Sequence, residues 1–290
     1  TAVCARLRAG SGSGAGGGGG GGARVLLSGH LDTVHDPAGA FRELSVRPDG
    51  KTATGPGCVD MKGGLVIAVA ALEVLEECGV ACSWSFIFNS DEETGSYHSD
   101  RHLREQARGH DVGLVFEPAL PDGSLVVERP GSGQFLIECR GRSAHTGRDF
   151  TKGVSAVTAL AERLVAIGGM SEPGRGMIAS VGPLSGNGAP NAVPEIARGW
   201  GNVRYQTPAI AQELGAKLDA LGTDAGAMPS CRVVRSFNRP AKPLTPATQR
   251  LAELARAAAA DLGQGMPFGK TGGVCDGNNL QAEGLATIDT

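Results

Sequence analysis

The sequence contains no apolar run of the roughly 20 residues that a membrane-spanning helix requires. Its opening residues, TAVCARLRAG, also lack the apolar core of a secretory signal peptide. There is no excess of basic residues either: a formal charge of −3 and a pI near 6.1 provide no positive field for a nucleic-acid backbone. We therefore expect a soluble protein that acts on a small molecule, with neither a membrane nor a nucleic acid as its partner.

Cysteines are few, and their spacing is not that of a metal cluster or a disulfide framework. The seven cysteines are an odd number, and no pair has C-x-x-C spacing. In a chain of 290 residues this favours reduced thiols, so we expect a cytoplasmic protein, with export left open. Cys58, two residues before a candidate metal ligand, is expected to pack rather than to bind.

The pattern of predicted elements changes near Glu128, and the chain is long enough for two domains. Before that point strands alternate with helices, which indicates an α/β sheet whose site lies at the carboxyl ends of the strands. After it the order is strand, helix, strand, strand, helix, strand, as in a ferredoxin-like α+β domain. An Ala-rich helix at 248–262 then returns to the first domain. We predict a catalytic metal-binding domain of residues 1–128 and 239–290, interrupted by an inserted domain of residues 129–238.

The segment 11–22 is almost entirely glycine and cannot bury side chains. We predict a flexible loop there, joining the strands 2–7 and 24–28 as a hairpin. The segment contains a G-x-G-x-x-G pattern, but a dinucleotide-binding fingerprint follows a buried strand and opens a helix, whereas here an apolar strand follows. Nucleotide binding is therefore not predicted.

A histidine and several acidic residues follow the predicted strands of the first domain. His30 and Asp32 in SGHLDT are two residues apart on a strand end, so their side chains face the same side. One ring nitrogen of His30 can bind a metal while Asp32 accepts a hydrogen bond from the other. A surface H-x-D turn is the alternative for this motif taken alone.

The other candidates are acidic residues whose positions are explained if they bind a cation. Asp60 in GPGCVDMKGG precedes a predicted helix, where a carboxylate either caps the helix or bridges two cations. Glu92 and Glu93 in NSDEETGS repel each other unless a cation accepts one of them. Glu93 is then a candidate ligand and Glu92 a candidate general base, with a solvated acidic turn as the alternative. Together with Glu117 in FEP, these residues indicate a two-metal hydrolase.

In this order, HLDT, GPGCVDMKGG, DEETGS, FEP, SAHTG and NAVPEIA resemble the di-zinc exopeptidase and deacylase family. That family includes glutamate carboxypeptidase, acetylornithine deacetylase and succinyl-diaminopimelate desuccinylase, and the resemblance spans nearly the whole chain. It implies a zinc-exopeptidase-type α/β sheet flanked by helices, with an inserted ferredoxin-like domain that serves dimerisation and closes over the substrate. It also implies a homodimer with two zinc ions per subunit, for which cobalt or manganese can substitute.

The resemblance gives each metal-site candidate a role. His30 and Glu117 would hold one zinc ion and Glu93 the other, while Asp60 would bridge the two. Asp32 would orient His30.

The same resemblance covers residues outside the metal ligands. Glu92 would be the catalytic base and proton shuttle. His145 in SAHTG is similar to the histidine that reaches across the dimer to stabilise the oxyanion. Asn191 and Arg204 resemble the groups that hold the substrate's carboxylate, a task suited to the forked donors of arginine. Asn202 stands where the family often has aspartate, so a structural salt bridge is the alternative role for Arg204.

The function that the resemblance implies is hydrolysis of an amide bond in a small peptide or N-acyl amino acid with a free carboxylate, as in glutamate carboxypeptidase. Deacylation of the acetylornithine or succinyl-diaminopimelate type is one alternative. A non-catalytic metal-binding relative is another, because the family's last zinc ligand is a histidine after the loop KTGGVCDGNNL, whereas none of the six histidines follows His145. We expect the sequence to be shortened at both ends, which leaves open whether this polypeptide is active as given.

Overall fold

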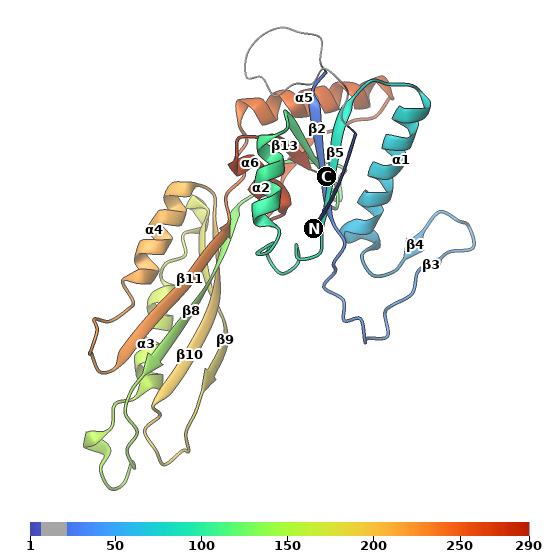
Figure 1. Ribbon diagram of the computed structural model, residues 1–290. Helices are drawn as coiled ribbons and strands as arrows, with labels where there is room; N and C mark the ends of the chain where they lie inside the picture. Colours follow the sequence, from blue (N-terminus) through green and yellow to red (C-terminus); the bar gives the residue numbers. More distant parts are fainter. Residues whose placement is uncertain (7–21, 290) are drawn as a thin grey trace. The chain divides into compact units, whose positions relative to one another are not determined.

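The computed structural model describes residues 1–6 and 22–289 of the chain. Most of the predicted glycine loop lies outside the described residues. The chain forms two compact units, whose elements are labelled in Figure 1. Unit 1 extends to Arg129 and resumes at Lys242, and unit 2 comprises Pro130–Ala241.

Unit 1 is built on a seven-stranded sheet with the order β1-β5-β2-β6-β13-β7-β12. β2 runs parallel to both β5 and β6, and β13 runs parallel to β6. β5, with the sequence SWSFIFN, has no exposed residue, as expected of a strand that is covered on both faces. The strands are β1 (Ala2–Arg6), β2 (Arg24–His30), β5 (Ser83–Asn89), β6 (Val112–Val115), β7 (Leu125–Glu128), β12 (Phe268–Lys270) and β13 (Ala286–Asp289), with a separate hairpin of β3 (Ser45–Val46) and β4 (Ala53–Thr54).

The predicted hairpin between the first two strands is wrong. β1 pairs antiparallel with β5, and β5 lies between β1 and β2. The reason is the parallel connection through α1, which places the buried strand β5 directly beside β2. β1 therefore pairs with the outer edge of β5.

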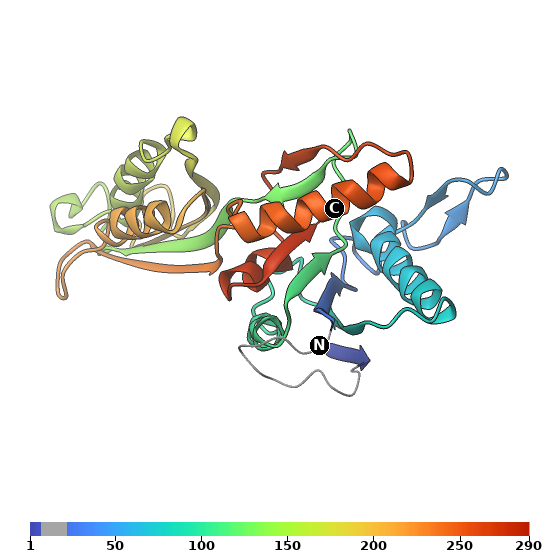
Figure 2. The same cartoon turned by 90° about the horizontal axis from the view of Figure 1, so that it is seen from above.

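Helices cover both faces of the sheet in unit 1 (Figure 2). Adjacent residues of β2 point to opposite faces: Leu27 packs with the residues of α1, whereas Leu26 packs with those of α2 and α6. α5 packs over the β7 and β13 part of the sheet through Ala252. No helix among the described residues combines the length and apolarity needed to cross a membrane. These helices are α1 (Gly63–Glu77), α2 (Asp100–Arg108), α5 (Pro246–Asp261) and α6 (Asp276–Ala282), and a short helical turn, η1 (Cys58–Lys62), precedes α1.

Unit 2 has the predicted ferredoxin-like topology. Its four-stranded sheet is antiparallel throughout, with the order β11-β8-β10-β9. One apolar core joins the sheet to both helices through residues such as Ile137, Leu160 and Leu214. The predicted fold class is thereby confirmed for this unit. Its elements are β8 (Gly131–Arg140), α3 (Ala156–Gly168), β9 (Met177–Gly186), β10 (Ile196–Tyr205), α4 (Pro208–Asp219) and β11 (Ser230–Arg239), with short turns at Phe150–Lys152 and Pro173–Arg175.

Candidate metal centre

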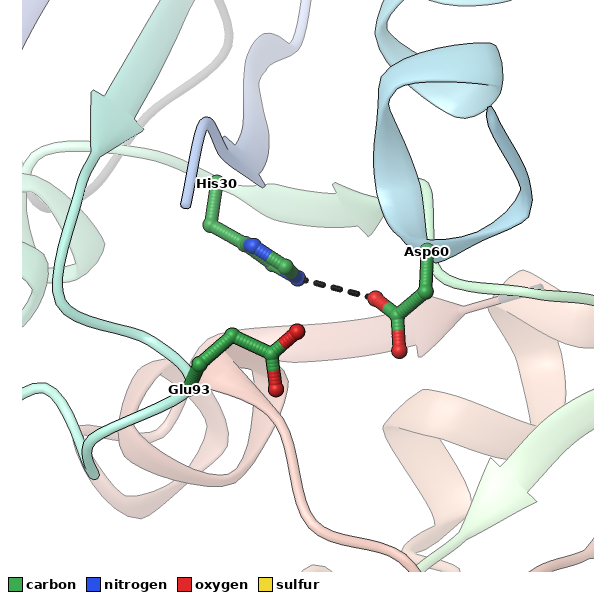
Figure 3. Close-up of side chains that lie close together, drawn as sticks. All are labelled: His30, Asp60 and Glu93. Carbon is green, nitrogen blue, oxygen red and sulfur yellow. Dashed lines mark hydrogen bonds and ion pairs between the residues drawn. The ribbon is translucent and has the colours of Figure 1, made fainter. Parts of the chain in front are cut away.

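Three of the predicted ligands converge at one edge of the sheet in unit 1. His30 ends β2, Glu93 follows β5, and Asp60 lies in η1 before α1. Because β2 and β5 are parallel neighbours, their carboxyl ends lie at the same edge. One ligand atom from each residue lies within 4.8 Å of the other two, and the side chains point toward one another in Figure 3. His30 Nε2 and Asp60 Oδ1 are 3.1 Å apart.

His30 is held in a single orientation by its surroundings. The side chain is 1% exposed, and its backbone N–H donates to Met61 Sδ at 3.2 Å. Nδ1 lies 3.1 Å from the backbone oxygen of Asp32 and 3.4 Å from its carboxylate Oδ1. The other carboxylate oxygen, Oδ2, accepts a hydrogen bond from the Glu93 backbone N–H at 2.9 Å. Asp32 thus contacts both ligand segments and faces Nδ1, which leaves Nε2 directed at the site.

Glu117 lies at the same nitrogen of His30 as Asp60 does. It follows β6, its side chain is 8% exposed, and Oε1 is 4.0 Å from His30 Nε2. Burial raises the pKa of Glu117 to about 8, with the negative charge of Glu92 adding to the effect. A buried carboxylate of this kind is stabilised in its charged form by an adjacent cation.

The charges around His30 favour a cation at this place. Burial alone lowers the pKa of His30, but the Asp60 hydrogen bond and three further carboxylates outweigh it and raise the pKa to about 9. Those carboxylates belong to Glu117, Glu92 and Asp32. An imidazole surrounded by carboxylates is a donor set that suits divalent zinc, cobalt or manganese. The residues therefore fit a metal ion.

Glu92 and Glu93 lie on a turn whose backbone is fixed by hydrogen bonds. Glu92 influences the pKa of both His30 and Glu117, which places its carboxylate within electrostatic range of both. Asp91, which sequence reasoning missed, accepts hydrogen bonds from the backbone N–H groups of His98 and Ser99 at 2.8 and 3.1 Å. These hydrogen bonds to Asp91 hold the turn on which Glu92 and Glu93 lie.

A second missed residue supports the same turn. Asp276, at the start of α6, is 1% exposed, and its two carboxylate oxygens accept from Asn89 Nδ2 at 2.7 Å and from Ser96 Oγ at 2.6 Å. Asn89 ends β5 and also donates to Ser99 Oγ at 3.0 Å. The sequence contains one sign of this residue, the polar run CDGNN in a segment that was expected to return to this domain. The hydrogen-bond partners of Asp276, however, lie far away in the chain.

A buried ionic cluster lies at the two boundary residues of unit 1. Asp289 accepts from Arg129 Nε and Nη2 at 2.9 and 2.5 Å, and its Oδ2 is 3.1 Å from Lys242 Nζ. The backbones of Arg129 and Lys242 also exchange two hydrogen bonds, of 2.9 and 3.0 Å. The positive charge of Arg129 acts to lower the pKa of Glu117, so the cluster is electrostatically linked to the metal centre.

The remaining predicted site residues belong to unit 2. His145 and Asn191 lie in adjoining loops, because His145 pairs with Ala192 and the Thr146 N–H donates to the Asn191 oxygen at 2.9 Å. The Gly147 N–H donates to His145 Nδ1 at 3.1 Å, which leaves Nε2 as the exposed donor of the ring. Arg204 lies on β10, and its Nη1 is buried without a hydrogen-bond partner among the described residues. Burial lowers the pKa of Arg204.

A protein-family model, described as peptidase family M20/M25/M40, matches residues 26–289. The chain is 30% identical over 189 residues to carboxypeptidase G2 of Pseudomonas sp. (strain RS-16), a match that covers 62% of this chain and 44% of that protein. It is also 30% identical over 214 residues to a succinyl-diaminopimelate desuccinylase of Methylorubrum populi, covering 67% of this chain and 55% of that protein. The chain therefore spans about half the length of these curated relatives.

Solved structures share the fold at lower identity. Aminopeptidase PepT of Bacillus cereus superposes with a TM-score of 0.75 at 24% identity, covering 93% of this chain and 73% of that one. The YXEP protein of Bacillus subtilis, described as a dinuclear metal-binding peptidase of the M20 family, superposes with a TM-score of 0.64 at 17% identity, covering 93% and 71%. The α/β fold class predicted from the sequence is confirmed by these likenesses.

Proposed function

Because the chain belongs to the peptidase family M20/M25/M40, we propose that its site hydrolyses an amide bond in a small peptide or an N-acyl amino acid with a free carboxylate. The observation that carries the proposal is the convergence of His30, Asp60 and Glu93 within 4.8 Å. Carboxypeptidase-like chemistry is favoured over deacylation by the likeness to carboxypeptidase G2, although desuccinylases are relatives of similar identity.

Two zinc ions are the proposed metals, with cobalt or manganese as possible replacements. His30 and Glu117 would hold one ion and Glu93 the other, with the Asp60 carboxylate shared between them. When bound, the metal ions supply Lewis acidity that polarises the amide carbonyl and acidifies water. Asp32 keeps the His30 ring in place through Nδ1, so that Nε2 remains the ligand atom.

Proton transfer is assigned to Glu92. This carboxylate would take a proton from the attacking water and later deliver it to the leaving amine, as a general base and then a general acid. Its electrostatic reach to His30 and Glu117 supports this position.

Substrate contacts are assigned to unit 2. His145 would stabilise the developing oxyanion through the exposed Nε2 donor. Asn191 and Arg204 would bind the substrate's carboxylate. The buried Nη1 of Arg204 has no hydrogen-bond partner within the described part of the chain, and this supports the proposal because a buried donor needs an acceptor.

Unit 2 is also the proposed dimerisation and substrate-closing domain. β9 is an edge strand of its sheet and leaves one side unpaired within the described strands. Ile178 and Leu184 on β9 are 41% and 59% exposed, and an open edge with apolar side chains is a template for pairing with a second chain. Light scattering on the purified protein tests this: a dimer whose mass halves in Leu184→Lys supports it, and a wild-type monomer contradicts it.

The test of function combines metal removal with a substrate panel. Protein stripped by a chelator should hydrolyse no N-acyl amino acid or dipeptide, and added zinc, cobalt or manganese should restore hydrolysis. Metal content is measured in parallel. If the protein binds metal tightly yet cleaves no member of the panel, the proposed function is refuted and a non-catalytic metal-binding role is supported.

A further inference from the structure

A cavity of about 310 Å³ adjoins the metal centre within unit 1. Asp60 and Glu93 form part of its wall, so the cavity opens directly onto the ligands. The remaining wall comes from the loop after His30 and from the stretch that runs from β4, labelled in Figure 1, into η1. A substrate held at the metal centre would have this cavity immediately beside its scissile bond.

The loop that forms the wall is fixed to the metal centre. The backbone N–H of Val34 donates to the Glu93 carboxylate. The rings of His35 and Phe41 meet edge to face, with centroids 4.9 Å apart and planes at 70°. Gly57 has a φ of +74°, and a Cβ there would lie 2.8 Å from Thr33 Cγ2, so glycine permits the close approach of the two wall segments.

The wall combines exposed apolar side chains with His35, two threonines and the two carboxylates. Val34, Phe41 and Val59 line it and are 75%, 44% and 73% exposed, so an apolar ligand would remove apolar surface from water at all three. Among the described residues that line the cavity there is no lysine or arginine. An anionic group in the cavity would face the like charges of Asp60 and Glu93, with His35 as the one ionisable nitrogen group among the described lining residues.

We propose that this cavity receives a neutral, apolar group on the acyl side of the scissile amide and selects against acyl groups that end in a carboxylate. The inference rests on the proposed function. We assign the cavity to the acyl side because the other half of the substrate bears the free carboxylate. A carboxylate is best bound by a lysine or arginine, and neither is among the described residues that line the cavity. N-Aliphatic and N-aromatic acyl amino acids, or dipeptides with an apolar first residue, fit this cavity, whereas N-succinyl amino acids do not.

The first experiment compares two acyl groups of similar length on one amino acid, chosen as the leaving half that the zinc-loaded protein accepts best. An N-pentanoyl substrate should be hydrolysed with a kcat/KM on the order of 100-fold above that of its N-succinyl counterpart, the range that pocket discrimination provides. Equal values, or a preference for N-succinyl, would overturn the cavity assignment while leaving the hydrolase proposal intact. Hydrolysis of neither substrate, nor of any panel member, would refute the hydrolase proposal instead.

Two pairs of variants locate the selectivity in the cavity. Phe41→Ala should lower kcat/KM for an N-phenylpropanoyl substrate about tenfold and leave an N-acetyl substrate within about twofold, since only the larger group reaches the ring. Leu44→Ala is the matched control: Leu44 is exposed and lines the adjoining cavity but not this one, so the ratio of the two substrates should not change.

The second pair introduces charge. Val34→Arg should raise the N-succinyl to N-pentanoyl ratio of kcat/KM about tenfold, because it supplies the missing cation. Val74→Arg, at an exposed valine of α1 outside the cavity, should leave the ratio at its wild-type value. If Phe41→Ala reduces all substrates equally and Val34→Arg leaves the ratio unchanged, the cavity does not bind the acyl group.

Discussion

The two units arrange their buried side chains differently. Unit 2 has one continuous apolar core in which Ile137, Ile167 and Leu214 are fully inaccessible. In unit 1 the apolar contacts are divided among three smaller clusters, beside a buried ionic cluster of Arg129, Lys242 and Asp289. Unit 2 also buries a charged side chain, Arg239, but outside its apolar core cluster. Apolar packing tolerates approximate partners, whereas a buried charge requires a particular one. Changes at the metal centre or the ionic cluster of unit 1 should therefore alter function or ionic pairing, and changes in the apolar core of unit 2 should alter stability alone.

The largest expected effect is on catalysis in unit 1. Glu92→Gln removes the proposed base without changing side-chain size, and kcat should fall by about 10²- to 10⁴-fold. The metal content and melting temperature of Glu92→Gln should stay at wild-type values. In the control Glu105→Gln, on the surface of α2, kcat, metal content and melting temperature should all stay at wild-type values. Activity that survives in Glu92→Gln would show that another group transfers the proton.

The next largest effect concerns the ionic cluster. Asp289→Asn leaves Arg129 and Lys242 buried without their shared carboxylate, and removing one member of a buried ionic group costs about 3–5 kcal/mol. Calorimetry should show a lower transition temperature for unit 1 and an unchanged transition for unit 2. A shift of both transitions together would show that the units unfold as one and would remove the contrast between them.

Truncation of a core side chain in unit 2 should lower the stability of unit 2 without affecting the metal centre of unit 1. Leu214→Ala deletes a fully buried side chain of α4, and the unfolding free energy of unit 2 should fall by about 2–5 kcal/mol. Metal content should not change. Leu262→Ala, at a position 76% exposed in unit 1, serves as the control and should shift stability by less than about 0.5 kcal/mol. Loss of metal from Leu214→Ala would contradict the separation of stability from function.

The smallest effect is expected at the N-cap residues of two helices, one in each unit. α4 and α5 both begin with T-P-A, and the side chains of Thr207 and Thr245 accept from the N–H groups of Ile210 and Thr248. Replacing either threonine by alanine should cost about 1 kcal/mol, in unit 2 for Thr207 and in unit 1 for Thr245. Serine at the same positions should restore most of the loss. Unequal losses in denaturant titrations would show that the surrounding packing, and not the cap itself, sets the cost.

The parts of the fold that could be predicted from sequence are those with a recognisable local composition, length or periodicity. Strands such as SWSFIFN and helices such as α1 have patterns that identify them without knowledge of their partners. β12 has only three residues, FGK, and the hairpin strands β3 and β4 have two each, so no period can be recognised in them. The pairing of β1 was missed because pairing depends on which strand is adjacent in space.

The same limit applies to the candidate site. His30, Asp60 and Glu93 were found because each directly follows or adjoins a recognisable element at one edge of a sheet. Asp276 was missed because its hydrogen-bond partners, Asn89 and Ser96, lie about 180 residues away in the sequence. Long-range polar pairing leaves no trace in a single sequence, since each partner alone resembles an ordinary loop residue.

The paired backbones of Arg129 and Lys242 have a consequence for how this protein can be rebuilt. The chain leaves unit 1 at one of these residues and re-enters it at the other, and the two are already neighbours joined by hydrogen bonds. A short reverse turn can bridge such a gap without stretching either end, which is the condition under which domain grafting succeeds. Residues 130–241 thus form an exchangeable cassette, for which another folded module with closely spaced termini can be substituted.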